Sequence, residues 1–150
     1  MYSDHSTLLR LLFVKKSNKK SISYQSKHST IKNIPLVKNK PKIRKAVLYC
    51  LNGHFAGNSI ELNDSILSIG RDPNLCQLVM PENITEISRR HCSVSYDNKN
   101  ECFLLEDHWS KNGTFIDNKR IPSGKKIHLN KGSNFYLDSH KNEFTVGIVE

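Results

Sequence analysis

The sequence predicts an all-β fold, and three observations support this prediction. From residue 46 onward the chain consists of short apolar, β-prone runs, polar turn residues separate these runs, and no stretch shows the apolar period of a helix. Short strands separated by turns at such intervals are typical of a β-sandwich or a β-barrel. We therefore expect about ten to eleven short strands, most of them antiparallel.

Turn-favouring residues bound the predicted strands. Asn52-Gly53 closes the first run, Gly70 stops the third, and Pro81 stops the fourth. Glycine and asparagine accept positive φ, and proline lacks the N–H that a strand ladder needs, so each of these residues can end a strand. The predicted strands are residues 47–51, 59–62, 66–69, 78–80, 91–96, 102–106, 114–116, 120–121, 126–129, 134–137 and 143–149.

Two of these regions predict more than the presence of a strand. The run that begins at His91 alternates in polarity, which places Cys92, Val94 and Tyr96 on one face of a strand. Asp117-Asn118 lies between two strand-like runs, and this short polar spacer predicts a tight β-hairpin.

Charge is distributed unevenly and divides the chain into two parts. The net charge of the 150 residues is +9. Residues 1–45 hold 12 Lys and Arg against one acid, Asp4, whereas residues 46–150 hold 11 against 13 acids. The first part has little apolar content after Val14, so it cannot bury enough surface to offset the entropy cost of ordering. We expect a basic, mostly disordered N-terminal arm over residues 1–45 and one folded domain over residues 46–150.

The cysteines and the N-terminal apolar run exclude several classes of protein. No two of the four cysteines form a Cys-x-x-Cys pair, so we expect neither a metal site nor another cofactor. The apolar run at residues 8–14 is interrupted by Arg10 and is too short for a secretory signal or a membrane span. We therefore expect a reduced, cytoplasmic protein without a membrane-spanning segment.

The chain also lacks the common sequence motifs of enzymes. It contains no Gly-x-Ser-x-Gly, no Walker loop and no His-Glu-x-x-His. The segment Ser123-Gly124-Lys125-Lys126 differs from a phosphate-binding loop because it lacks the first glycine and the Lys-Ser/Thr ending. We expect no catalytic residue and no enzymatic activity.

Three polar, turn-rich segments lie beside predicted strands, at residues 70–74, 88–91 and 110–114. Turns that are connected to strands of one sheet system can gather at one end of it. Together these segments would offer several cations, a hydroxyl and an amide, which suit an anion carried on a peptide. They contain no activated nucleophile, so binding is favoured over a reaction.

The order Gly-Arg, Ser-x-x-His and Ser-x-Asn-Gly-Thr resembles the forkhead-associated (FHA) domain family over residues 46–149. This resemblance implies a β-sandwich of the FHA/SMAD-like kind rather than a barrel. It further implies that loops at one end bind a phosphothreonine-containing protein or peptide. A Ser/Thr kinase is then implied upstream, and the function would be to recruit a phosphorylated partner in kinase signalling.

The resemblance also implies roles for the motif residues. The residues of the first two motifs that would hold the phosphate are Arg71, Ser88 and Arg89. The third motif would supply Lys111 as a nearby charge and Asn112 as a hydrogen-bonding partner of the peptide backbone. The residues expected to shape the site are Gly70, His91 and Gly113.

Two residues near the motifs have expectations of their own. Trp109 stands where the family often has glycine, and we expect it to pack under the loop; if exposed, it would contact ligand side chains. Glu86 precedes Ser88 by two residues and is expected to border the peptide groove, where it would favour Lys or Arg in the ligand.

Two alternatives involve the basic arm. In one, the chain is a nucleic-acid-associated protein that binds phosphates or acidic surfaces weakly and non-specifically through residues 1–45, and the β-domain is a phosphate-independent interaction module. In the other, Thr7 or Thr30 of the arm is phosphorylated and captured by the domain of the same or a second copy. The arm lacks aromatic residues interleaved with its cations, so the phosphopeptide interpretation is preferred.

Overall fold

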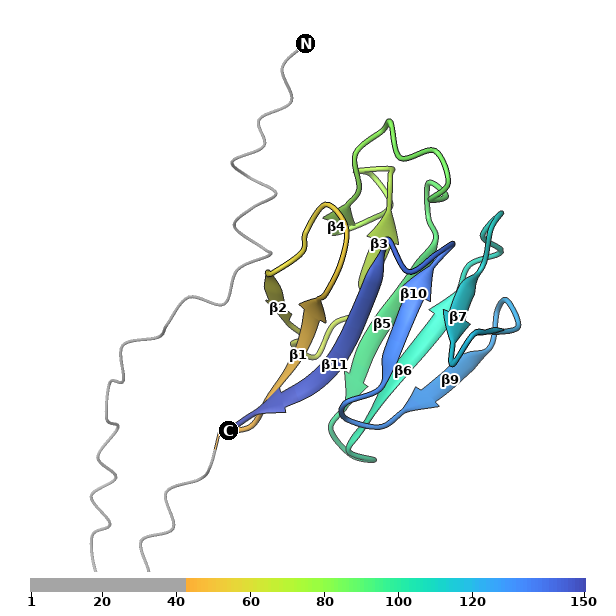
Figure 1. The fold of residues 1–150 in the computed structure, drawn as a ribbon. Helices are drawn as coiled ribbons and strands as arrows, with labels where there is room; N and C mark the ends of the chain where they lie inside the picture. Colours follow the sequence, from red (N-terminus) through yellow and green to blue (C-terminus); the bar gives the residue numbers. More distant parts are fainter. Residues whose placement is uncertain (1–42) are drawn as a thin grey trace, which may run out of the picture.

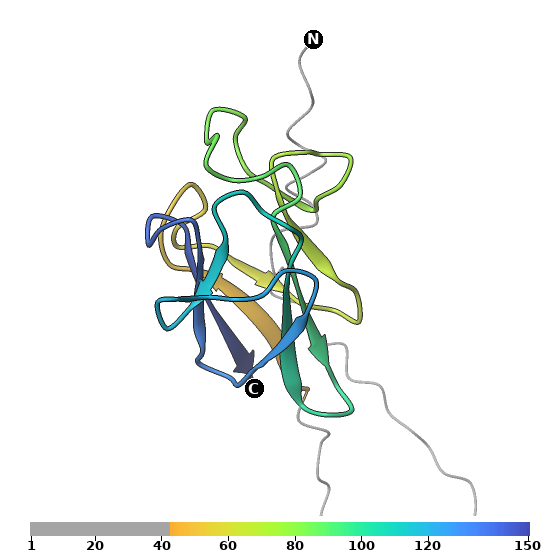
Figure 2. The same ribbon diagram turned by 90° about the vertical axis from the view of Figure 1, so that its right-hand side faces the viewer.

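A computed structural model describes residues 43–150, which form eleven strands in two sheets (Figure 1). The six-stranded sheet contains, in spatial order, β2 (Ser59–Glu61), β1 (Lys45–Cys50), β11 (Glu143–Val149), β10 (Asn134–Leu137), β7 (Thr114–Ile116) and β8 (Lys119–Arg120). The five-stranded sheet contains β4 (Leu78–Val79), β3 (Leu67–Gly70), β5 (Cys92–Asp97), β6 (Cys102–Asp107) and β9 (Lys126–Leu129). Figure 2 shows the two sheets side-on as separate layers, so the predicted β-sandwich is confirmed.

The strand pairing agrees with the prediction of a mostly antiparallel fold. The pairing of β3 with β4 is parallel, whereas the other registers within residues 43–150 are antiparallel. Each predicted strand is present, with its ends shifted by at most two residues. The predicted arm, residues 1–45, lies outside the described residues apart from its last three, and β1 begins at Lys45.

The core is formed by alternate residues of both sheets. Cys92 and Val94 point inward from β5, and Tyr96, on the same face, packs against Phe103 with a ring-centroid distance of 4.8 Å. In the opposite layer, Phe135 on β10 stacks on Phe144, its partner on β11, with a ring-centroid distance of 5.3 Å. Burying one such large apolar side chain contributes roughly 1.5–3 kcal/mol.

The predicted hairpin at Asp117-Asn118 connects β7 to β8. Both turn residues have positive φ, 49° and 60°, and Ile116 pairs with Lys119 across the turn. Two successive residues with positive φ define a type I′ turn, whose twist matches that of the strands. Aspartate and asparagine tolerate this conformation, which is why the dipeptide predicted the hairpin correctly.

The cysteines of the domain lie in its interior. All four cysteines are free and buried, and burial raises the pKa of Cys50 and Cys76 to about 11, so both remain protonated at neutral pH. Within residues 43–150, no cluster of His, Cys, Asp or Glu could hold a metal ion. No helix in this range is long and apolar enough to cross a membrane.

Candidate functional site

Three connections meet at one end of the sandwich, the upper end in Figure 1: β3–β4, β4–β5 and β6–β7. The backbone N–H of Arg71 donates to the Ser88 carbonyl at 3.2 Å, which joins the first two connections. The backbone N–H of Lys111 donates to Ser88 Oγ at 3.0 Å, which joins the second and third. An open groove of about 400 Å³ lies between them, lined by Arg71, Leu75, Thr85, Ser88, Arg89, Arg90 and Lys111.

Gly70 ends β3 at a point of very close backbone approach. A Cβ at this position would lie 2.2 Å from the carbonyl oxygen of Arg89 and 2.9 Å from Cys76 Sγ. Any side chain would therefore push the β4–β5 connection away from β3. Cys76 Sγ donates to the same Arg89 carbonyl at 3.2 Å, so the backbone that carries Arg89 is held from two sides.

The Arg71 side chain is held before any ligand is bound. Its Nε donates to the Ile87 carbonyl at 2.5 Å, and its Nη1 lies 3.5 Å from the Glu82 carbonyl. These bonds fix the direction of the half-buried guanidinium along the groove wall. No described residue accepts a hydrogen bond from Nη2, so this end of the fork is available to an anion.

His91 links the second and third motifs from inside the protein. The side chain is fully buried, its Nδ1 accepts the Ser88 N–H at 3.1 Å, and its Nε2 lies 2.9 Å from the Gly113 carbonyl. These two partners assign the hydrogen to Nε2, which donates to Gly113. Burial lowers the pKa of His91, although the hydrogen bond to Gly113 opposes this shift. The neutral imidazole therefore supports both loops.

Asn112 connects the same two loops at the surface. Its Nδ2 donates to the Glu86 carbonyl at 2.9 Å, and no described residue donates to its Oδ1. The amide nitrogen is thus occupied within the protein, and the oxygen remains as an acceptor for a peptide N–H. Gly113 follows with φ of +91°, and a Cβ there would lie 2.7 Å from Arg120 Nε.

Asp107, at the end of β6, organises the third motif and was not predicted from the sequence. Its buried carboxylate accepts hydrogen bonds from the hydroxyls of Ser110, Thr114 (2.8 Å) and Ser123 (2.6 Å). The Ser110 N–H donates to it at 3.2 Å, and Ser110 Oγ in turn accepts the Gly113 N–H at 3.0 Å. The spacing Asp-x-x-Ser of Asp107 and Ser110 was the available signal, because this pattern forms a local turn.

The hydrogen bonds to Asp107 also decide its charge. Burial alone would raise the pKa of this carboxyl, but the bonds from Ser110, Ser123 and Thr114 stabilise the ionised form and leave the pKa below its ordinary value. The carboxylate is therefore charged at neutral pH. Since β6, the β6–β7 connection and the β8–β9 connection all converge on it, Asp107 holds the third motif in place.

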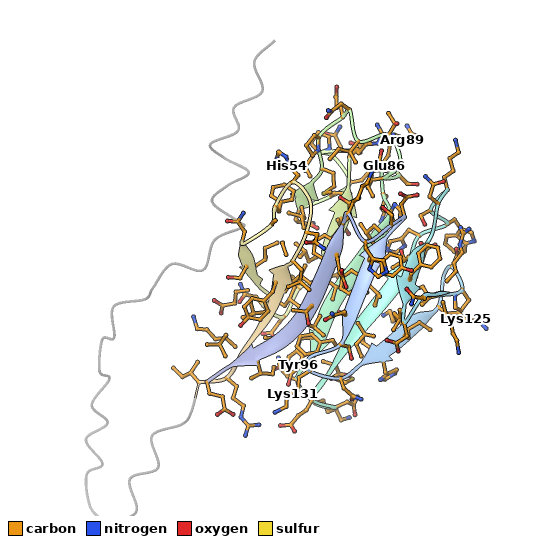
Figure 3. The ribbon with its side chains drawn as sticks, viewed as in Figure 1. His54, Glu86, Arg89, Tyr96, Lys125 and Lys131 are labelled. Atoms are coloured by element: carbon orange, nitrogen blue, oxygen red, sulfur yellow. The ribbon has the colours of Figure 1, made fainter. Side chains whose placement is uncertain are left out.

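The predicted site residues divide into two groups in the structure. Those that line the groove together are Arg71, Ser88, Arg89 and Lys111. Those that lie behind or beside it and hold its walls are Gly70, His91, Asn112 and Gly113. Figure 3 shows Arg89 and Glu86 at the same end of the sandwich, although Glu86 is half-buried and is not part of the groove lining.

Three groove residues were missed or placed differently by the sequence interpretation. Arg90, which follows Arg89 in the second motif, is exposed and lines the groove. Thr85 and Leu75 also line it, and Leu75 is 48% exposed. No sequence signal marks a single leucine or threonine in a polar connection as part of a groove.

Trp109 differs from the expectation that it would pack under the loop. It is 75% exposed and has a φ of +51°, the conformation that a glycine would adopt freely. The Ser110 side chain occupies the space under the loop, bonded to Asp107, and this leaves the indole outside.

The groove is strongly cationic. Its lining contains Arg71, Arg89, Arg90 and Lys111 and no acidic side chain. A phosphate group carries about −1.5 to −2 charges at neutral pH and offers three acceptor oxygens. The Ser88 hydroxyl uses an acceptor position for Lys111 N–H, which leaves its hydrogen for such an oxygen. The arrangement can bind a phosphorylated side chain.

Comparison with known proteins gives a consistent result. Residues 67–138 match the family model of the FHA domain. A probable serine/threonine-protein kinase, fhkA of Dictyostelium discoideum, is 30% identical over 112 residues, which are 69% of this chain but 18% of that protein. The chain therefore spans less than a fifth of the length of this curated relative.

Solved structures are similar over the same region. The FHA domain of the CT664 protein from Chlamydia trachomatis is 24% identical, with a TM-score of 0.58 over 69% of this chain and 96% of that one. An FHA domain studied for phosphothreonine-dependent interactions is 26% identical, with a TM-score of 0.56 over 71% and 98%. The FhaA FHA domain, solved in complex with the intracellular domain of Rv3910, is 27% identical, with a TM-score of 0.53 over 67% and 98%.

Proposed function

Because this chain carries an FHA domain, we propose that it is a phosphothreonine-dependent peptide-binding module that recruits a phosphorylated partner protein. The observation that supports this function is the groove, in which four cations and a serine hydroxyl from three connections surround one open space. FHA domains are non-catalytic interaction modules that bind phosphothreonine peptides, and Arg clusters are a recurring means of phosphopeptide recognition.

In the proposed complex the phosphate lies between Arg71, Ser88 and Arg89. The Nη2 end of the Arg71 fork and the Ser88 hydroxyl donate to its oxygens, and Lys111 adds a point charge from the third connection. Hydrogen bonds between charged groups contribute roughly 1.5–3 kcal/mol each. Arg71 and Ser88 are already held by backbone partners, so little side-chain entropy is lost on binding.

The peptide backbone is recognised separately from the phosphate in this proposal. Asn112 Oδ1 accepts an N–H of the peptide, while its Nδ2 stays bonded to the Glu86 carbonyl. One amide then holds the groove wall and fixes the position of the ligand. A Ser/Thr kinase supplies the phosphothreonine, and the preference for threonine follows from family membership.

The function is tested by fluorescence anisotropy with the full chain. The probes are one degenerate peptide library in three forms, with phosphothreonine, phosphoserine or unmodified threonine at the central position, each at two salt concentrations. We expect binding to the phosphothreonine form alone. Equal binding to the three forms, or binding to none, would contradict the proposal.

The alternative of nucleic-acid binding rests on the basic arm, which lies outside the described residues apart from residues 43–45. Residues 46–150 carry a small net negative charge, with 11 Lys and Arg against 13 acids. No observation on the described domain favours this alternative over phosphopeptide binding.

A further inference from the structure

The exposed Trp109 packs against the backbone of Gly124, which we call the glycine seat. Both Trp109 and Gly124 have positive φ, +51° and +73°. A Cβ at Gly124 would lie 2.7 Å from both Cη2 and Cζ2 of the indole, so the ring lies flush against the glycine backbone. One side of the ring is thus supported by the protein, while 75% of the residue remains exposed to solvent.

Asp107 holds the two connections that form this seat. Its carboxylate accepts hydrogen bonds from Ser110, next to the tryptophan, and from Ser123, next to the glycine. The Gly124 N–H also donates to the Asp107 carbonyl at 2.8 Å. The indole is therefore presented at a defined position and is not a loosely attached side chain.

Three lysines lie close in the sequence to Trp109 or to Gly124. Lys125 and Lys126 follow the glycine seat, Lys111 lies two residues after the tryptophan, and all three are exposed. None of them forms an ion pair within 4.0 Å in the described part of the chain. Two acidic residues lie nearby: Glu106 faces Lys126 in the β6–β9 register, and the buried Asp107 carboxylate accepts hydrogen bonds from Ser110 and Ser123.

We call this surface the Trp109 platform and define it as Trp109, Gly124, Lys111, Lys125 and Lys126. Its Lys111, two residues after Trp109 in the same connection, also lines the phosphate groove. Figure 2, which turns this side toward the viewer, shows the β6–β7 and β8–β9 connections next to each other below the β4–β5 connection. A polypeptide that leaves the groove past Lys111 can reach the indole.

We propose that the Trp109 platform is a second docking site for the phosphorylated partner, which it contacts through an acidic segment that carries an aromatic or aliphatic side chain beside the phosphothreonine. This inference rests on the proposed function and adds a ligand preference to it. Acidic side chains complement the three lysines, and the apolar side chain packs on the exposed face of the indole. Both contacts act within one chain, so the second is favoured by the high effective concentration that the first creates.

The inference is tested with three phosphothreonine peptides and the full chain. The core peptide has only Gly, Ser and Ala beside the phosphothreonine, and two longer peptides add an acidic segment containing Phe on the N-terminal or the C-terminal side. We expect one of the longer peptides to bind about fivefold to tenfold more tightly than the core peptide. The gain should shrink at high salt, since the lysines are exposed.

Substitutions then identify the residues on which the gain in affinity depends. Trp109→Gly removes the indole and suits the positive φ, so the fold is retained; it should abolish the gain and leave core binding unchanged. The double change Lys125→Glu and Lys126→Glu should do the same. Lys131→Glu is the matched control, because this exposed lysine lies far from Lys125 (Figure 3), and it should preserve the gain.

The outcomes separate this inference from the proposed function. Core binding without any gain from either extension would overturn the platform and leave the function standing. A gain that persists in Trp109→Gly would also overturn it. Loss of binding to the core peptide itself would overturn both. Binding of an oligonucleotide or an anionic vesicle that depends on Trp109, without a peptide gain, would assign the platform to another occupant and contradict the inference.

Discussion

Ser88 Oγ accepts a hydrogen bond from the backbone N–H of Lys111 at 3.0 Å, across 23 residues of sequence. This bond makes one hydroxyl both the joint between two connections and a donor for the ligand. Since an acceptor position of the oxygen is occupied, the hydroxyl hydrogen is free to point toward an anion in the groove.

Replacing Ser88 by alanine should weaken phosphopeptide binding by about tenfold, because it removes a donor to the phosphate and the acceptor of the Lys111 N–H. Anisotropy with the core phosphothreonine peptide measures the loss. Ser95→Ala, on the five-stranded sheet, is the control and should bind normally. Unchanged affinity in Ser88→Ala would remove the hydroxyl from the proposed site.

Arg71→Ala should weaken binding by about tenfold or more, since a charge-assisted fork is lost. Arg71→Lys should recover only part of this loss, because a lysine keeps the charge but cannot bond to both the Ile87 carbonyl and the ligand in the same geometry. Titration calorimetry of the three proteins with one peptide compares them. If Arg71→Ala binds as tightly as the wild type, the phosphate site is misassigned.

His91 should make the protein less stable as the pH falls. Its pKa is lowered in the folded state by burial, so the unfolded chain binds the proton more readily. The stability that the neutral ring supports is complete above the unfolded pKa of about 6.5 and is lost as the pH falls below it toward the depressed folded value.

Urea unfolding between about pH 7.5 and pH 5 measures this dependence. His91→Gln should be less stable at neutral pH and should show a flatter pH dependence. The pKa of His108 is also lowered, with burial as the main cause, so His108→Gln is the necessary comparison. Asp107 titrates in a lower range, because its pKa lies below the ordinary value for an aspartate. If the free energy of unfolding changed equally with pH in the wild type and in His91→Gln, the pH dependence could not be assigned to His91.

Asp107→Asn should destabilise the domain by roughly 2–4 kcal/mol, because a buried amide cannot accept from three hydroxyls and brings two donors of its own. Chemical denaturation measures the change. Asp117→Asn, at an exposed turn residue with positive φ, should have almost no effect. A stable Asp107→Asn protein with normal phosphopeptide binding would show that the carboxylate does not organise the third motif.

Local patterns were sufficient for the strands and for most of the cations that line the groove. Strand spacing, the Asp117-Asn118 turn and the three motifs are properties of a few consecutive residues, so each can be recognised without knowing the layers. The motif residues expected to hold phosphate do line one groove. That Asn112 contacts the peptide backbone stays a prediction, and in the structure its amide nitrogen donates to the Glu86 carbonyl.

What the sequence by itself determined was therefore the all-β class, the strand positions and the identity of most groove cations, because these follow from local polarity and turn chemistry. The tertiary structure alone decided that Asp107 joins Ser110 to Ser123, that His91 reaches Gly113, and that Trp109 lies outward on Gly124. These contacts depend on which residues the two layers bring together. They also depend on whether Trp109 or its neighbour Ser110 fills the space under the loop of the third motif. Periodicity within one strand carries no information about either, so the groove's support and the Trp109 platform became visible only in the folded protein.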